Sequence, residues 1–205
     1  FPFFEGTYRI HESDPYQAFR QIVQALTDAR GTRLDTLGLT IGEYDYIDYL
    51  THPGKAPETL SGLSEDDLRK GLFYAVRKLI HHAAKKPLVL IFEDLHWADP
   101  QSFELLEYVM EGVEGTRLLM VLIHRPDIAK PWDRRLNYTE LVLQPFHPTE
   151  VGELVQDVLS VNRVARTTLD RLSTLSRGNP LFVEEVLRHL LDANALEIQT
   201  TEDGS

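Results

Sequence analysis

The spacing of hydrophobic residues changes several times along the chain, and each spacing predicts an element. Residues 3–10 (FFEGTYRI) are predicted to form a short strand. Apolar residues then recur at helical spacing over 15–29, which predicts an amphipathic helix. A longer apolar stripe begins after Ser64 and ends at two lysines and Pro87, as a helix does. Residues 31–63 carry several Gly and Pro and no long period, so we expect a loop with one or two short helices.

Two apolar runs do not alternate with polar residues, which predicts strands buried on both faces, as in a parallel sheet. The first is LVLIF (88–92), which ends abruptly in Glu93 and Asp94. The second is RLLMVLIHRP (117–126), which ends in polar residues and a proline. ELVLQ (140–144) alternates more clearly, and we expect it to be a third strand of this part of the chain.

After Pro145 the pattern is entirely helical. Breaks at Asn162 and at Gly178-Asn179-Pro180 separate three helical patterns, over 148–160, 165–176 and 180–193. Alternating strands and helices followed only by helices predict an α/β layer with a small helical subdomain. We therefore expect a core over residues 1–145 and a helical part over 146–205.

Composition narrows the possible functions. The length of 205 residues predicts one domain of ordinary size, or one core with a small appendage. The 42% of hydrophobic and 26% of charged residues fit a globular protein. Its net charge of −11 disfavours binding to a nucleic-acid backbone. Without cysteine there is no disulfide, thiolate zinc site or cysteine nucleophile. No apolar run approaches the roughly 20 residues that span a bilayer, and no signal peptide is expected in these residues.

Glu93 and Asp94 are the strongest candidates for chemistry. Ligands of open α/β sheets bind at the carboxyl ends of the strands, where these two residues are predicted to lie. The first acid of such a pair can hold Mg²⁺, and the second can polarise a water that attacks a phosphate. Alternatively, the two acids only mark where the strand meets solvent, with Asp99 capping the next helix. The residues alone favour neither interpretation.

The segment EDLHWAD (93–99) resembles the Walker B motif of the signal-transduction ATPases with numerous domains, a branch of the AAA-like P-loop NTPases. LLMVLIHRP resembles the next core strand, which ends at the sensor 1 position, where His124 or Arg125 is available. LVLQPFHPTEVGELV is similar to the family's last strand and first lid helix, and GNPLF, with Gly178 and Pro180, to the stretch near the adenine. The resemblance covers roughly residues 1–195.

The resemblance implies an α/β fold: a three-layer P-loop NTPase-type parallel sheet, N-terminally truncated, followed by a small helical lid subdomain. Two departures stand out. The first acid is commonly Asp in the family but is Glu93 here. The Walker A pattern G-x-x-x-x-G-K-[ST] does not occur in the sequence, and Gly54-Lys55 does not supply it. We expect the Walker A strand, loop and helix to lie upstream of Phe1; a domain that never had them is the alternative.

The resemblance also implies a function. It indicates an ATP-binding and ATP-hydrolysing regulatory switch within a larger bacterial, cytoplasmic signalling protein, with Mg²⁺ and ATP held between core and lid. Glu93 is assigned to Mg²⁺, Asp94 to water activation, Arg125 to the γ-phosphate, and Gly178 and Pro180 to the adenine. The partner is a covalently linked output domain of the cyclase, kinase or transcription-regulator type, with other protein partners possible and neither nucleic acid nor membrane bound directly. The alternative is a catalytically inactive, ATPase-like scaffold for protein contacts.

Weaker candidates remain from the residues themselves. The spacing of His81, His82 and His96 matches no metal-binding motif, so they are interpreted as surface and loop histidines. Asp94, His96 and Ser102 could suggest a hydrolytic triad, but they lie too close in sequence and lack a nucleophile elbow.

Overall fold

The computed structural model describes residues 2–10, 14–31, 34–128, 130, 132, 137–193 and 195. The chain divides into two compact units, Phe1–Tyr138 and Thr139–Ser205, which we call the sheet unit and the helical unit. The sheet unit contains β1 (Phe3–Thr7), α1 (Gln17–Arg30), α2 (Leu34–Leu37), α3 (Ile41–Thr51), the 3-10 turn η1 (Glu58–Leu60), α4 (Glu65–Ala83), β2 (Leu88–Glu93), the 3-10 turn η2 (Leu95–Trp97), α5 (Pro100–Met110) and β3 (Leu118–Leu122).

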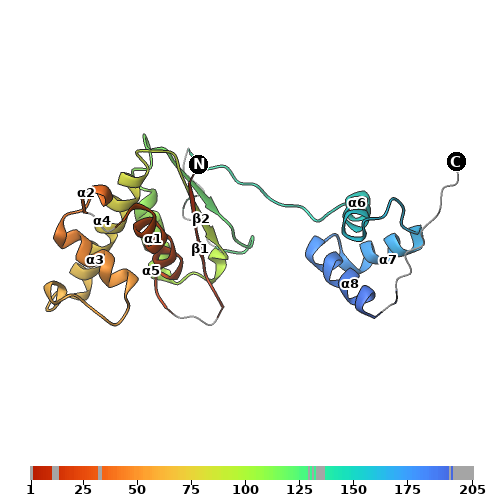
Figure 1. Ribbon diagram of the computed structural model, residues 1–205, viewed down its shortest axis with the longest axis horizontal. Coiled ribbons are helices and arrows are strands. Elements are labelled where there is room, and N and C mark those ends of the chain that lie inside the picture. The colour runs from red at the N-terminus through yellow and green to blue at the C-terminus, as the bar shows by residue number, and fades with distance from the viewer. Residues whose placement is uncertain are drawn as a thin grey trace. The chain divides into compact units, whose positions relative to one another are not determined.

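The three strands form a parallel sheet in the order β1-β2-β3 (Figure 1). Thr7 pairs with Glu93 at one end of the sheet, and Phe92 pairs with Leu122 beside it. Each connection moves one strand further in the same direction. Because crossovers between parallel strands are right-handed, both connections place their helices on the same side of the sheet. Figure 1 accordingly shows the helices of this unit on one side of the strands.

In β2 only the face of the sheet that carries the helices is fully buried. Leu88, Leu90 and Phe92 of β2 are buried, and the alternating Val89 and Ile91 are only partly covered. The expectation that the apolar runs are buried on both faces is therefore wrong for the described residues, which form two layers rather than three. An uninterrupted apolar run also arises when the second face is apolar but has nothing packed on it.

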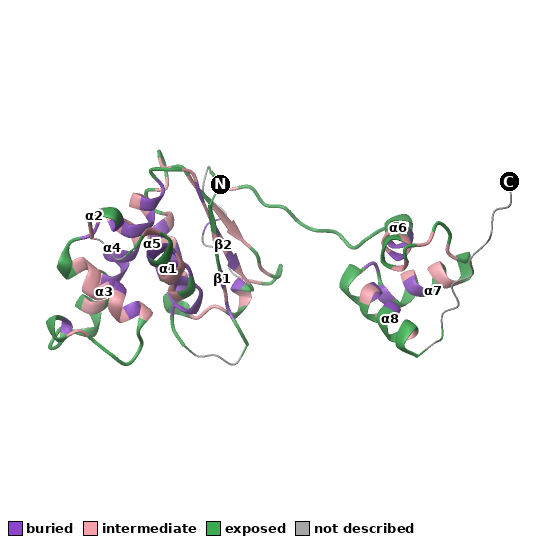
Figure 2. Cartoon of the chain, viewed as in Figure 1, coloured by how far each residue is buried: buried purple, intermediate pink, exposed green. Residues whose placement is uncertain are grey.

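The core lies between the sheet and the helices α1, α4 and α5, whose inward faces are buried (Figure 2). Phe19 of α1 contacts Phe92 of β2, with 4.9 Å between the ring centroids. Gly6 allows β1 to approach α1 closely, because a Cβ there would lie 2.3 Å from the carbonyl oxygen of Ala18. The predicted helices over 15–29 and after Ser64 are confirmed as α1 and α4.

The segment 31–63 contains two helices, α2 and α3, as expected, and α3 is the longer one with 11 residues. A capping box explains its start. The Glu43 amide donates to the Thr40 hydroxyl at 3.3 Å, and the Thr40 amide donates to the Glu43 carboxylate at 2.7 Å. Reciprocal bonds of this kind satisfy two amides that a helix otherwise leaves unpaired. The sequence contained this Thr-x-x-Glu signal, but the aromatic acidic stretch after it lacks an obvious helical period.

The predicted strand over 140–144 is not formed. These residues are described and lie in no ladder, and Leu141 and Leu143 are 85% and 93% exposed (Figure 2). Alternating β-branched and apolar residues favour a strand only where a partner strand and a packed surface exist. The chain has left the sheet unit at Tyr138, and no neighbouring strand accompanies it in the described residues.

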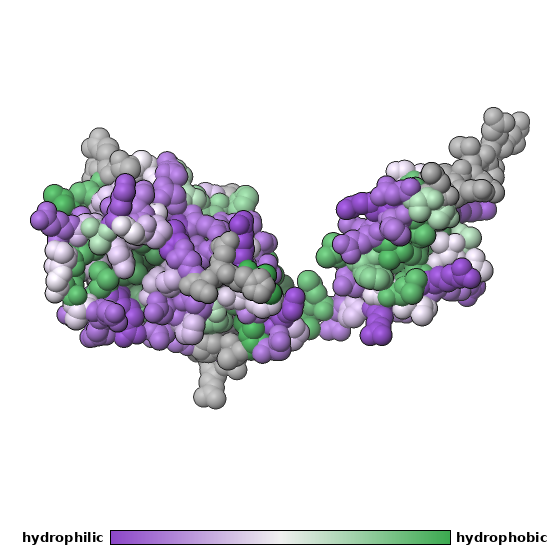
Figure 3. All heavy atoms as spheres, turned by 90° about the horizontal axis from the view of Figure 1, so that it is seen from below, coloured by the Kyte–Doolittle hydropathy of each residue, from purple (hydrophilic) through white to green (hydrophobic). Residues whose placement is uncertain are grey.

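The helical unit contains α6 (Pro148–Leu159), α7 (Arg166–Ser176) and α8 (Pro180–Asp192), which confirms the three predicted helices. They share a small core of Val151, Val155, Leu172, Val183 and Leu187. Figure 3 shows hydrophobic residues at the surface of this unit as well. Its exposed apolar side chains include Leu175, Leu181, Phe182 and Leu191. None of the described helices of the chain is long and apolar enough to span a membrane.

Candidate functional site

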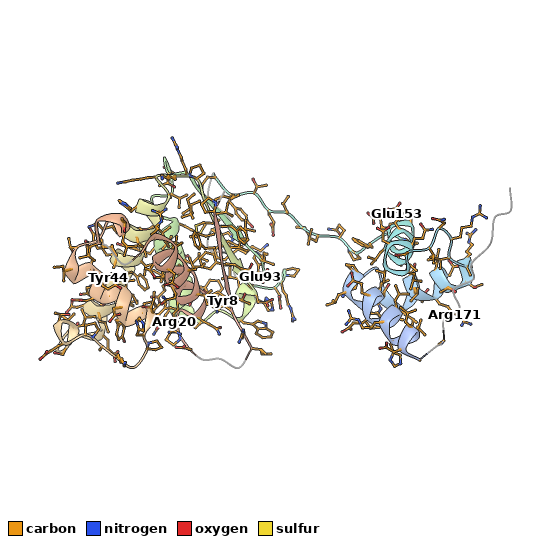
Figure 4. The ribbon with its side chains drawn as sticks, in the orientation of Figure 1. Tyr8, Arg20, Tyr44, Glu93, Glu153 and Arg171 are labelled. Carbon is orange, nitrogen blue, oxygen red and sulfur yellow. The ribbon has the colours of Figure 1, made fainter. Side chains whose placement is uncertain are left out.

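Two acidic side chains, Glu5 in the middle of β1 and Glu93 at the carboxyl end of β2, lie on one face of the sheet. Glu93 is the last residue of β2, and its carbonyl accepts a hydrogen bond from the Tyr8 amide at 3.1 Å (Figure 4). Burial raises the pKa of the Glu93 carboxyl, and the nearby charges of Glu5 and Asp94 raise it further. Sequence reasoning missed Glu5, although it precedes Thr7 by two residues and therefore shares a face of the sheet with Glu93.

Asp94 occupies a tight turn directly after β2. Its backbone is left-handed, with φ 53°, and its carbonyl accepts a hydrogen bond from the Trp97 amide at 2.8 Å. Asp and Asn tolerate this conformation better than most residues. The next amide, of Leu95, donates to the Ile123 carbonyl at 3.0 Å and so attaches the turn to the end of β3. The Asp94 side chain itself is exposed.

Arg125 follows β3 on the same edge of the sheet. Its exposed guanidinium lies over the Trp97 ring, 5.4 Å from the ring centroid. An arginine on an aromatic face keeps its donors free to bind an anion. His124, the other sensor candidate, is turned back, with Nδ1 2.7 Å from the Arg125 carbonyl and its ring 6.1 Å from that of the buried Trp132. The structure therefore favours Arg125 over His124 as the exposed cation of this edge.

Asp99 fixes the helix that follows the acidic pair. Its carboxylate accepts hydrogen bonds from the Ser102 amide at 2.9 Å, the Ser102 hydroxyl at 2.5 Å and the Tyr16 amide at 3.2 Å. These bonds join the starts of α1 and α5. Burial, and secondly the Asp99 charge, raise the pKa of Tyr16 to about 12. Ser102 is thus buried in a structural network, which argues against the hydrolytic triad.

His96 is confirmed as a loop histidine, since it lies in the turn η2, and it is partly buried there. Both ring nitrogens are inaccessible and have no hydrogen-bond partner among the described residues. The ring packs on Trp97, with 4.7 Å between centroids. A buried polar group without a partner costs on the order of 1–3 kcal/mol. The sequence carried no signal for this burial.

Gly178 and Pro180 lie in the helical unit, whereas Glu93, Asp94 and Arg125 lie in the sheet unit. Gly178 has φ 77°, and its carbonyl accepts a hydrogen bond from the Phe146 amide at 2.7 Å. Asn179 caps α8 by accepting from the Leu181 amide at 3.1 Å. Pro180 occupies the first turn of α8, where a missing amide costs nothing. The motif therefore has a demonstrated structural role.

The residues at the sheet edge fit a magnesium ion better than a complete phosphate site. Mg²⁺ in nucleotide sites is commonly bound by one or two carboxylates together with waters and phosphates. Glu93 and Glu5 supply carboxylates whose mutual repulsion a cation relieves. Among the described residues, no group of three or more His, Asp or Glu side chains could hold a metal alone. The Gly-rich loop that cradles phosphates does not occur in the sequence.

Residues 3–122 match the sequence model of the AAA ATPase domain, which covers more than half of the chain. The chain belongs to this family. The match runs from β1 to the end of β3, so Glu93 and Asp94 lie inside the AAA ATPase domain and Arg125 lies just beyond it. The family assigns nucleotide binding to this domain in general and agrees with the parallel α/β sheet.

Two further comparisons extend the picture. Residues 148–204, which contain α6 to α8, match a model described as a domain of unknown function (DUF8739). An uncharacterised protein of Rhizobium meliloti (strain 1021), R02095, is 30% identical over 123 residues. The alignment covers 55% of this chain but only 12% of that relative, so the chain spans a small part of the relative's length. No solved structure matches the chain.

Proposed function

We propose that this chain is part of an ATP-dependent regulatory switch in a larger bacterial, cytoplasmic signalling protein. The protein would be of the STAND type, the signal-transduction ATPases with numerous domains. The observation that carries the proposal is the acidic pair Glu93-Asp94 at the carboxyl end of β2, within an AAA ATPase domain. Arg125 lies at the same edge of the sheet, after β3. Open α/β sheets bind their ligands at this edge.

In this proposal each residue of the edge has a separate role. Glu93 helps to hold Mg²⁺, which supplies charge neutralisation to the phosphates when it is bound. Asp94 accepts a hydrogen bond from the attacking water and polarises it, and Arg125 contacts the γ-phosphate. The resemblance assigns Gly178 and Pro180 to the adenine. Nucleotide binding and release then switch an output domain of the cyclase, kinase or transcription-regulator type.

Two features of the sheet support a phosphate-binding part outside these residues. The outer edge of β3 has no partner strand in the described part of the chain, and Leu119 on the uncovered face is 59% exposed. An apolar face and an open strand edge are costly to leave in water. A further strand and helix, carrying the Gly-rich loop, is the simplest structure that covers both.

The test is Asp94→Asn in the full-length protein that contains this chain. Asparagine also tolerates the left-handed backbone of position 94, so the turn is expected to keep its shape. We expect ATP turnover to fall by about 100-fold or more, as on loss of a general base, with ATP affinity retained. Asp157→Asn, an exposed change in α6, is the matched control and should keep full turnover. Unchanged turnover in Asp94→Asn contradicts the assignment.

The alternative function is a scaffold without catalysis, favoured by the absence of a Walker A pattern from the 205 residues. Calorimetric titration of the full-length protein with Mg-ATP separates the two. Binding supports the switch. No binding favours a sheet whose open face contacts another protein.

A further inference from the structure

A pocket lies away from the acidic edge of the sheet, and its lining side chains carry positive rather than negative charge. It has a volume of about 360 Å³ and lies along the C-terminal half of α4, beside the end of α2. Its lining side chains recur every three or four residues and so share one face of α4. The pocket is lined by Gly38, Tyr74, Arg77, Lys78, His81, His82 and Lys85.

The lining is cationic and includes no carboxylate. Glu43 reaches Lys78 from α3, with its two oxygens 2.7 and 2.8 Å from Nζ. Arg77 lies over the Tyr108 ring, 3.8 Å from the centroid, and its Nη1 donates to the Tyr108 carbonyl at 3.5 Å. It forms no ion pair with a carboxylate of the described residues. Lys85 is exposed and likewise forms no ion pair within the described ranges. This local excess of positive charge occurs in a chain whose net charge is −11.

The two histidines belong to the pocket rather than to the open surface. His81 Nε2 lies 3.4 Å from the Val109 carbonyl, and Gly38 packs directly on the His82 ring. Burial lowers the pKa of His81, and the Arg77 charge lowers it further. Burial also lowers the pKa of His82, followed by the charges of Lys85 and Arg30. The charges that act on both imidazoles are therefore cations.

We propose that this pocket binds a small anion with at least two negative charges, of the phosphate or phosphate-ester class. Arg77 and Lys85 provide charged donors without an acidic partner among the described residues, and the two imidazoles provide further donors once protonated. Tyr74, half-exposed beside Lys78, offers an aromatic face at the rim for a ring attached to the phosphate.

This anion site is separate from the proposed ATP site. The last turn of α4 leads into the start of β2, whereas Glu93 is at its other end. At about 3.3 Å per residue, the two ends of the six-residue strand β2 lie about 17 Å apart. The proposal therefore does not depend on ATP binding.

Calorimetric titration of the 205-residue chain with inorganic pyrophosphate tests the proposal. We expect saturable binding at one site. Lys85→Gln should weaken it about tenfold, and Arg77→Gln/Lys85→Gln should weaken it further, as expected for loss of charged donors. Arg163→Gln/Arg166→Gln removes the same charge from the helical unit and should leave the affinity unchanged. Since Arg77 packs on Tyr108, Lys85→Glu at an exposed position serves as a second variant that keeps the fold.

Histidine NMR supplies a readout that nonspecific attraction does not produce. Sulfate keeps its charge across the range used, so any pH dependence comes from the protein. A bound dianion favours the protonated imidazoles, so sulfate should raise the pKa of His81 and His82 and bind more tightly at about pH 6 than at about pH 8. The proposal is overturned if pyrophosphate does not bind, or if the Arg163→Gln/Arg166→Gln variant loses as much affinity as the Arg77→Gln/Lys85→Gln variant. It is also overturned if Glu93→Gln/Asp94→Asn abolishes pyrophosphate binding.

Discussion

Replacing Gly178 by alanine is expected to destabilise the helical unit alone. The backbone of Gly178 has φ 77°, where a Cβ is unfavourable. A Cβ built there lies 2.4 Å from the Phe146 carbonyl oxygen and 2.9 Å from the Phe146 amide nitrogen. These are backbone atoms, so no rotamer change removes the overlap.

The magnitude follows from three contributions. The left-handed backbone costs about 1 kcal/mol for a residue with a Cβ. Moving Phe146 away breaks its 2.7 Å hydrogen bond to the Gly178 carbonyl, which contributes about 1 kcal/mol. Displaced packing adds a further amount of similar size. The sum of about 2–4 kcal/mol is large for a unit of this size, whose total stability is on the order of 3–10 kcal/mol.

Hydrogen exchange measured by mass spectrometry on the 205-residue chain resolves the effect by element. Gly178→Ala should speed exchange in α7 and α8 and leave β2 and α4 unchanged. Arg177→Gly is the matched control, since the exposed Arg177 is also left-handed, with φ 51°, and glycine should slow exchange there. Unchanged exchange in α7 and α8, or equal acceleration in β2, would refute the reasoning.

Three further predictions concern the sheet unit. Asp99→Ala should lower the free energy of unfolding in urea by about 2 kcal/mol through loss of a cap, whereas Asp99→Asn should cost much less. Leu90→Ala in the buried face should cost about 2–5 kcal/mol, and Leu119→Ala on the open face well under half of that. The pKa of Glu93 is raised in the fold by burial and by the Glu5 charge, so the folded state holds the proton more tightly. Glu93→Gln should therefore stabilise the chain at neutral pH, and urea titrations should show this gain vanish as pH falls below about 4.5.

Much of the fold could be predicted because helix periods and caps are local signals. Ser64 and Asp99 mark the starts of α4 and α5. Each side chain accepts a hydrogen bond from a backbone amide of the first helical turn, as expected for a residue of its type. The strand at 140–144 could not be predicted correctly, because alternation reports a preference for a sheet and not the presence of a partner. The open second face of β2 was missed for the same reason.

Some residues of the candidate site could likewise be placed from the sequence, and others could not. Glu93 and Asp94 could be placed from the sequence, since they directly follow a strand whose apolar run is unmistakable. Glu5 and the buried ring of His96 depend on register and on the packing of neighbouring elements, which no short motif encodes. The basic pocket on α4 was equally hidden. Most of its side chains are spread over residues 74–85, and its positive charge becomes evident only when the structure shows that no carboxylate lines it.

The order of the strands connects the open face with the acidic edge. Right-handed crossovers from β1 to β2 and from β2 to β3 run in one direction and cover one face only. Helices can cover the other face only if another connection in the chain runs the opposite way, beginning from a strand beside β3. Strand order then reverses at that position, and open α/β sheets bind ligands where it reverses, at the carboxyl ends. The residues nearest to such a point are those that follow β2 and β3. Asp94 and Arg125 therefore lie where a completed sheet would have its ligand, by an argument that uses topology alone.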